Sequence, residues 1–458
     1  MSLSSLMATI NSSSLNAVLP YLAKILHLTL NESQMLIVVY LVVLTSILTI
    51  CGKFADTVGH KIVFLSGTLT FGLSALIVLI GETIELMVFM RIIQAIGASL
   101  MVASGPSILL EAFEPEHRGF AIGIHTTGIS LGLIAGPPIG GFILRHLSWH
   151  WLFLINIPIS FIVFAAISLI IPLKKIPNSD NRHYDLYGML LWAIAIPTIL
   201  ISMSTLSHSP AVSLAIFSLG VGLIILFVKH ELTVKTPFFP IHLIKIPAYY
   251  GGLFSLLFGY AALFIPNFLI PFYLKIVLGL EPHQTGLIMS ITSIAMFATT
   301  GISGYLSDKI GYYKLCIAGM ILLTAGLVIL YLLDARSAIV QITVAQIVTG
   351  MGLGIFNSPN TTALINIGGI ENAGITTGLL ATMRNLGMSI GTVIAAISVS
   401  TCHLLIFEER IEKISNIPPQ NFKLIFKYSM AMAFLISFIS VYLSTIRKGI
   451  PTTSKTQK

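Results

Sequence analysis

The feature that most constrains this chain is a succession of fourteen apolar runs, each long enough to cross a lipid bilayer as a helix. A hydrocarbon core of about 30 Å needs roughly 20 apolar residues in an α-helix. The runs are continuously apolar and do not alternate, which predicts helices and argues against a membrane β-barrel. They lie at about 5–26, 33–52, 61–81, 86–110, 119–144, 149–172, 187–206, 212–229, 248–274, 284–303, 313–333, 337–358, 373–401 and 425–446.

The composition agrees with a membrane protein. Only 9% of the 458 residues are charged and 55% are hydrophobic, whereas about 25% of an ordinary soluble domain is charged. Such a chain cannot cover a soluble surface, so a soluble enzyme, a nucleic-acid binder and a disordered protein are excluded. The three cysteines, Cys51, Cys316 and Cys402, are far apart, so we expect no disulfide framework, no metal site and no cofactor.

The basic residues predict the orientation of the helices. Fifteen of the 25 Lys and Arg residues fall on the side of the two termini. The opposite side gains several basic residues from one long predicted loop at about 402–424. Cytoplasmic loops collect Lys and Arg, so we expect both termini in the cytoplasm and a multi-pass protein of a cell inner membrane.

The chain contains an internal repeat. The loop motif Gly52, Asp56 and Gly59 recurs as Gly304, Asp308 and Gly311, shifted by 252 residues, and other matches in register follow it along the chain. Eight predicted helices separate the copies, whereas two six-helix halves require six. We therefore predict an all-α membrane protein with fourteen helices arranged 6+2+6. The expected parts are an N-terminal six-helix bundle at 1–172, an inserted two-helix hairpin with its loops at 173–247, a C-terminal six-helix bundle at 248–446 and a tail at 447–458.

The repeated loop predicts a cytoplasmic latch. Asp56 can accept hydrogen bonds from the amides that begin the next helix and can pair with His60 or Lys61. The alternative is an ordinary tight turn with a capping Asp, which a second copy makes a weaker explanation. The expected gating residues are Gly52, Asp56, Gly59, His60, Lys61, Gly304, Asp308, Gly311 and Lys314.

The run at 119–144 carries glycines at spacings of four and eight beside two prolines. Such glycines share a helix face and admit another backbone closely, while proline permits a bend. The alternative is helix packing without any role in transport. The motif consists of Gly123, Gly132, Gly136, Pro137, Gly140 and Gly141.

Polar residues inside the runs are candidates for a central cavity. Arg91 is costly in lipid and should face the cavity, unless it extends to the outer interface. Arg384 is the other deep cation, and His125 is a candidate proton carrier or a packing residue. The candidates for substrate or coupling contacts are Asn11, Arg91, Gln94, His125, Asn156, Gln346 and Arg384.

These motifs resemble those of a known family. The turn at 52–61, RIIQAIG from Arg91 and the glycine-proline motif are similar to signatures of the major facilitator superfamily. MATINSSSLNAVLP, SWHWLFLINIPIS and IPFYLKIVLGLEPHQTG resemble its fourteen-helix drug/proton antiporter branch. The resemblance implies a proton-driven exporter of lipophilic, often cationic, drugs. This branch usually has Asp in the first helix where this chain has Asn11, and we expect no carboxylate deep in any span.

We therefore expect an alternating-access exporter of amphipathic small molecules, driven by protons, rather than an enzyme. The first alternative is an exporter of an anionic or zwitterionic metabolite that uses Arg91 or Arg384 and has weak or no proton coupling. A more remote alternative is a membrane sensor that does not transport. The expected partners are a small-molecule substrate, protons and the lipid bilayer, with no nucleic acid, and the chain is expected to be monomeric.

Overall fold

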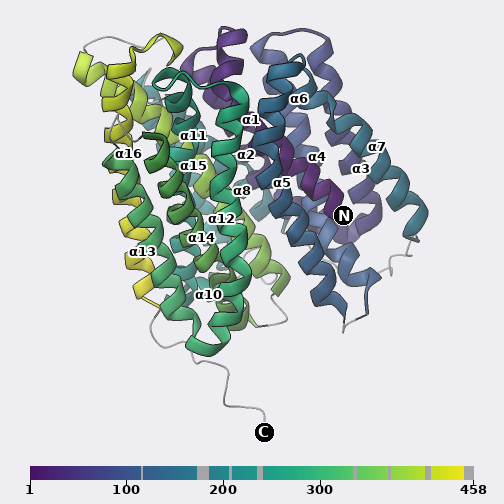
Figure 1. Ribbon diagram of the computed structural model, residues 1–458. Helices are drawn as coiled ribbons and strands as arrows, with labels where there is room; N and C mark the ends of the chain where they lie inside the picture. The colour runs from purple at the N-terminus through teal and green to yellow at the C-terminus, as the bar shows by residue number, and fades with distance from the viewer. Residues whose placement is uncertain are drawn as a thin grey trace.

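The structure, a computed structural model, describes residues 1–114, 117–172, 185–205, 209–234, 241–333, 338–369, 373–407 and 414–447. Within these ranges every regular element is a helix. Residues 173–184 and 235–240 of the loops that flank the predicted hairpin, the tail from 448 and the side chain of Asp308 lie outside the described residues. Figure 1 shows two groups of long helices side by side.

The first group of helices precedes residue 172. It consists of α1 (Ser2–Ile25), α2 (Leu30–Val58), α3 (His60–Ser74) with the 3₁₀ turn η1 (Ala75–Leu79), α4 (Ile84–Ala112), α5 (Arg118–His146), α6 (Trp151–Leu154) and α7 (Asn156–Ile170). We call this group the N-terminal bundle. The predicted run at 149–172 is thus divided at Ile155 into a short helix and a long one.

The remaining helices form a hairpin and a second group. The hairpin consists of α8 (Leu186–Thr205) and α9 (Pro210–Glu231). The C-terminal bundle contains α10 (Ile241–Ile244), α11 (Pro247–Ile276), α12 (Pro282–Ile310), α13 (Tyr312–Tyr331), α14 (Ala338–Gly368), α15 (Ala373–Phe407), the 3₁₀ turn η4 (Ile414–Asn416) and α16 (Pro419–Thr445). The predicted loop at 402–424 was too long, because α15 continues to Phe407 and α16 already begins at Pro419.

Thirteen of the described helices are long and apolar enough to cross a membrane, counting α3 with η1 and α6 with α7. The fourteenth predicted span, α1, has 24 residues but is too rich in Ser and Asn to belong to this set. Fifteen of its residues are buried inside the protein. Because other helices rather than lipid surround α1, it can carry polar side chains along most of its length.

The packing of helices repeats between the two bundles. In the N-terminal bundle α1 packs on α5, α2 on α4, and α3 on both α4 and α7. In the C-terminal bundle α11 packs on α15, α12 on α14, and α13 on both α14 and α16. The hairpin lies outside these pairs and contacts α2 and α15 (Figure 1). The same arrangement of helices therefore occurs twice, as the sequence repeat suggests.

The glycines of α5 explain its close approach to α1. A Cβ atom added at Gly132 would overlap Thr9, one at Gly136 would overlap Ser13, and one at Gly140 would press against Ser14. In the second bundle Gly387 and Gly391 meet the backbone of α11 in the same way. A Cβ atom added at Gly123 or at its counterpart Gly378 would meet no other helix within 4 Å in the described structure. Most of the predicted glycine face thus packs against α1, and its counterpart packs against α11; the exceptions are Gly123 with Gly378, and Gly141, which packs against the start of α12.

One end of the molecule is defined by the end of α1 and the start of α2. We call it the external end, following the orientation predicted from the basic residues, and the opposite end the cytoplasmic end. In Figure 1 the external end is at the top.

Candidate functional site

A buried arginine is the centre of the polar site in the N-terminal bundle. Arg91 on α4 is only 1% exposed, so it does not extend to the outer interface. Its Nη1 donates to Asn11 Oδ1 at 2.7 Å and to Gln94 Oε1 at 2.6 Å. Its Nε donates to the Leu36 carbonyl at 3.0 Å, and the guanidinium carbon lies 4.2 Å from the centre of the Tyr40 ring.

All the partners of this guanidinium are neutral. Two side-chain amides, a peptide carbonyl and an aromatic face provide hydrogen bonds and a cation–π contact, but no negative charge. The described carboxylates that belong to helices occupy their first or last turns, and the buried one, Glu231, is the last residue of α9. The centre of the N-terminal bundle therefore carries a net positive charge that is hydrogen-bonded but not neutralised.

The other predicted cavity residues lie apart from this cluster. His125 is 8% exposed, and its Nε2 lies 3.4 Å from the Ser5 hydroxyl. Asn156 donates to the Phe153 carbonyl one turn earlier, at 2.9 Å. Gln346 is 2% exposed and its Nε2 lies 3.6 Å from Met289 Sδ. Arg384 is exposed on α15. The structure thus joins Asn11, Arg91 and Gln94 and leaves the remaining four separate.

The first copy of the predicted gating motif holds three titratable groups together at the cytoplasmic end. His60 Nε2 lies 3.6 Å from an Asp56 oxygen and 3.6 Å from a Glu111 oxygen. Lys61 does not join them, because its Nζ donates to the carbonyls of Ser168 and Ile171. The motif therefore connects α2, α3 and α4 through His60, and fastens α3 to the end of α7 through Lys61.

The second copy has the same backbone turn with different side-chain contacts. Gly59 and Gly311 both have positive φ angles, 105° and 88°, between two helices. Residues with a Cβ atom are strained in this conformation, which explains why glycine recurs. Lys314 is exposed, and Tyr313 donates instead to the Thr445 carbonyl at the end of α16, at 3.4 Å. The backbone turn is thus repeated, whereas the described side chains around it differ; the side chain of Asp308, the counterpart of Asp56, lies outside the described residues.

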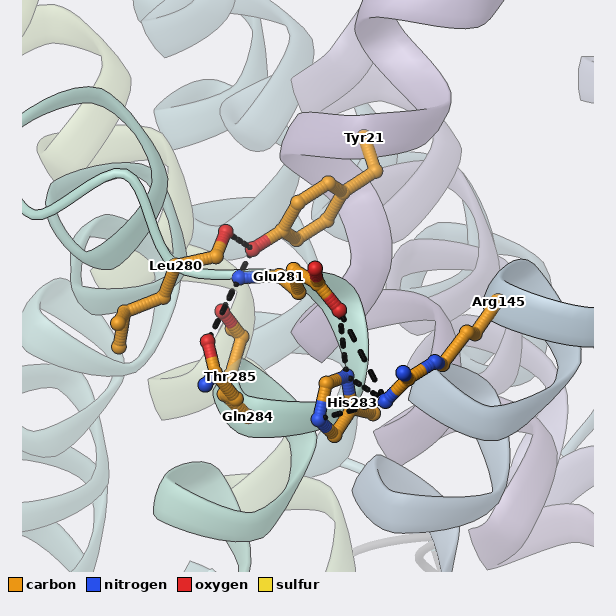
Figure 2. A network of polar contacts seen from close by, with 7 residues as sticks. All are labelled: Tyr21, Arg145, Leu280, Glu281, His283, Gln284 and Thr285. Carbon is orange, nitrogen blue, oxygen red and sulfur yellow. Dashed lines mark hydrogen bonds and ion pairs between the residues drawn. The ribbon is translucent and has the colours of Figure 1, made fainter.

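Hydrogen bonds join the two bundles at the external end. The Tyr21 hydroxyl of α1 donates to the Leu280 carbonyl at 2.7 Å and lies 2.6 Å from the Thr285 hydroxyl of α12 (Figure 2). Lys275 of α11 donates to the Pro20 carbonyl at 2.9 Å, and its Nζ lies 4.3 Å from the centre of the Tyr21 ring. Both contacts connect the ends of helices that belong to different bundles.

A second group of contacts lies beside Tyr21. Figure 2 shows Arg145 of α5 reaching towards His283 and Glu281 at the start of α12. Arg145 Nη1 lies 2.9 Å from His283 Nε2 and 3.8 Å from a Glu281 oxygen, and that carboxylate lies 3.2 Å from His283 Nδ1. The backbones also meet closely, since a Cβ at Gly141 would overlap Pro282. These contacts close the external end between α5 and α12.

Deeper in the molecule two asparagines face each other across the same boundary. Asn16 Nδ2 of α1 donates to Asn267 Oδ1 of α11 at 3.1 Å. Asn16 is 9% exposed, and its own Oδ1 has no hydrogen-bond partner in the described structure. Asn16 was absent from the predicted cavity residues.

A sequence signal for this pair exists. Asn16, Pro20 and Lys24 recur as Asn267, Pro271 and Lys275, each shifted by 251 residues. The pattern marks the first helix of each bundle, and it places the two asparagines opposite each other. The repeat is therefore visible in α1 and α11 as well as in the loops and the glycine-rich helices.

Comparison with known proteins identifies the family. The family model described as Major Facilitator Superfamily matches residues 1–392. The riboflavin transporter RibZ of Clostridioides difficile (strain 630) is 31% identical, over 84% of this chain and 84% of that protein. The multidrug transporter protein MdtP of Bacillus subtilis (strain 168) is 27% identical, over 83% of this chain and 71% of that protein.

A solved structure supports the fold. A bacterial homologue of the human lysosomal transporter Spinster, described as inward-facing and unoccupied, has a TM-score of 0.69 with 12% identity. The match covers 97% of this chain and 95% of the other. The repeated packing of helices, the buried polar cluster and these similarities agree: the chain belongs to the major facilitator superfamily and is a multi-pass membrane transporter, not an enzyme.

Proposed function

We propose that this protein exports amphipathic small molecules by alternating access, with weak coupling to protons. The observation that carries the proposal is the set of contacts between the bundles at the external end, which joins α1 and α5 to α11 and α12. A transporter that closes one end between two repeats can release its substrate there when those contacts separate. The cluster of Asp56, His60 and Glu111 lies within the N-terminal bundle at the opposite end, where we propose that it forms part of a cytoplasmic latch.

The substrate class follows from the charge of the site. A buried Arg91 surrounded by neutral groups repels cations and tolerates neutral or anionic molecules. This favours the second candidate function, export of a neutral, zwitterionic or anionic metabolite, over export of cationic drugs. Similarity to a riboflavin transporter at 31% identity agrees with this preference. Similarity to a multidrug transporter at 27% identity is also compatible with a wider range of substrates.

Weak proton coupling follows from the missing carboxylate. A buried acid can attract a cation and bind a proton in exchange, whereas the amide of Asn11 accepts a hydrogen bond but does not titrate. Asn11 instead holds Arg91 in place. We further propose that the protein is a monomer of the cell inner membrane with both termini in the cytoplasm, and that the chain is divided as 1–172, 173–247 and 248–446.

Transport by purified protein in liposomes tests this function. The substrates are riboflavin, an organic anion and the cationic dye ethidium, each measured with and without an imposed pH gradient. We expect transport of riboflavin that changes little with the gradient, and slower transport of ethidium. Strong, gradient-driven export of ethidium without riboflavin transport would contradict the preference for neutral or anionic molecules. Transport of none of these compounds would contradict the proposed function.

A further inference from the structure

Asn16 and Asn267 occupy equivalent places in the two bundles. Each lies nine residues before the end of its helix, Ile25 in α1 and Ile276 in α11. At 1.5 Å per residue this is about 14 Å from the external end, close to half of a hydrocarbon core of about 30 Å. The pair therefore lies near the middle of the membrane, on the boundary between the bundles and below the external contacts of Tyr21 and Lys275.

The pair has an unused hydrogen-bonding group. Asn16 donates from Nδ2 to Asn267, at 3.1 Å, so the amide is fixed in one orientation. Its Oδ1 is buried and without a partner in the described structure. A buried acceptor that is left unpaired is energetically unfavourable, so a ligand that supplies a donor gains this interaction. Asn267 is only half-buried, which leaves the partner amide within reach of a ligand.

We propose that Asn16 and Asn267 recognise the substrate through an amide edge, and that the substrate class is a neutral ring compound with a lactam or imide group. The inference rests on the proposed function and specifies its substrate. A lactam or imide presents an N–H beside a C=O. Asn16 Oδ1 accepts from the N–H, and the Asn267 amide provides the matching donor. Phe264, half-buried and one turn from Asn267 on α11, provides an apolar face for the ring.

This arrangement also explains selectivity. A site that is built to hydrogen-bond an N–H rejects an analogue that lacks it, because the protein acceptor is then left unpaired. A cation gains nothing from the pair beyond one carbonyl oxygen and is repelled by Arg91. Since the two amides belong to different bundles, a substrate that binds both is released when the bundles separate at the external end.

The test uses a pair of ligands that differ only in the donor. Riboflavin has an imide edge with a free N–H, and 3-methylriboflavin has a methyl group in its place. Quenching of flavin fluorescence gives the binding affinity for the full-length protein in phosphatidylcholine nanodiscs. The variants are Asn16→Leu, which keeps the shape and removes both polar atoms, and Asn16→Asp, which keeps an acceptor. Asn366→Leu is the control, because it removes an amide that bonds to Tyr312 at the cytoplasmic end of α14.

We expect the wild type and Asn366→Leu to bind riboflavin roughly tenfold more tightly than 3-methylriboflavin, the effect of about one hydrogen bond. Asn16→Leu should bind both flavins equally, and Asn16→Asp should keep part of the preference. An unchanged preference in a well-folded Asn16→Leu protein would overturn the role of the pair and leave the proposed function intact. Binding of ethidium but of neither flavin would overturn the substrate class. Binding and transport of no probe would reject the proposed function as well.

Discussion

Replacing Asn11 by Asp changes the charge of the buried cluster and almost nothing else. The two side chains have the same shape, and the Asn11 oxygen already lies 2.7 Å from Arg91 Nη1. The introduced carboxylate oxygens can therefore occupy the positions of the amide oxygen and nitrogen. The Asn11 Nδ2 has no partner in the described structure, so the substitution breaks no hydrogen bond that it donates. The net charge of the cluster falls from +1 to zero.

The size of the effect on transport can be worked out from this charge. A unit charge at about 10 Å contributes about 1.7 kcal/mol to the energy of a bound cation when the effective dielectric constant is about 20. Removing the repulsion should therefore lower the KM for a cationic dye by roughly tenfold. Within the cluster, attraction between the new charges at about 4 Å gains about 4 kcal/mol, while burying a carboxylate costs several kcal/mol. These effects nearly cancel, so we expect the variant to fold.

The assay is ethidium and riboflavin transport in liposomes, with and without a pH gradient. Asn11→Asp should accelerate ethidium export, make it dependent on the gradient, and leave riboflavin transport within about threefold of the wild type. Gln94→Glu is a second test of the same charge, because Gln94 Oε1 lies 2.6 Å from Arg91 Nη1. Asn366→Asp is the control, since it adds a carboxylate at the cytoplasmic end of α14, by Tyr312, and should change neither KM.

Two results would refute this reasoning. An unchanged ethidium KM and pH dependence in a well-expressed Asn11→Asp protein would show that the Arg91 cluster does not influence the bound substrate. An equal gain from Asn366→Asp would show that any added negative charge attracts the dye, so the place of the charge would be irrelevant.

Four further predictions concern orientation, gating, the buried cation and the hairpin. A reporter fused after Lys458 should be cytoplasmic and one inserted between α15 and α16 external; the same location for both would contradict the predicted topology. Asp56→Asn should insert and express normally but lose at least about tenfold in turnover, because His60 loses a charged partner, whereas wild-type transport rates would reduce the motif to a turn. Arg91→Ala should abolish transport and Arg91→Lys retain part of it, since lysine keeps the charge but not the planar donors; unaltered transport by Arg91→Ala would exclude a role for the cluster. Burial alone raises the pKa of Asp185, but hydrogen bonds from the Gly188 amide and His230 outweigh this effect and lower the pKa. The ionised Asp185 therefore stabilises the folded protein above the unfolded pKa of about 3.9, and this stabilisation is lost as the pH falls. The thermal destabilisation of Asp185→Asn should accordingly be larger at pH 7 than at pH 4, and an equal loss at both would contradict the assignment.

The number and order of the helices could be predicted because lipid imposes a length and a polarity on each segment. A helix such as α9, which is mostly exposed and apolar up to its last turn, is predicted to within a few residues of its observed ends. The helix α1 is long enough to cross the membrane but is more polar than the other spans. It can be polar because other helices, rather than lipid, surround most of it. Hydropathy averages over a whole span and therefore resolves neither the short break at Ile155 nor the extension of α15 to Phe407.

The candidate site was predictable only in part, because some of its contacts join helices that are far apart in the sequence. Arg91 and Gln94 share one face of α4, so their proximity follows from helix geometry. The contact of Arg91 with Asn11 depends on how α1 and α4 cross and is not contained in either segment. Lys61 lies next to His60 in the sequence but points to α7, because neighbouring residues in a helix face different directions.

The internal repeat makes one contact between distant helices predictable from the sequence. In a duplicated transporter, residues at equivalent positions in the first helix of each half lie close to the pseudo-twofold axis, so a residue that recurs there faces its own copy. Asn16 and Asn267 satisfy this condition and form a hydrogen bond, whereas Arg91 has Thr343 at the equivalent position, shifted by 252 residues. The charge of the site therefore belongs to one half alone, while the amide pair belongs to both. We therefore expect the asymmetric charge to set the preference for neutral or anionic substrates, and the shared pair to bind the amide edge of the substrate only while the two halves are together.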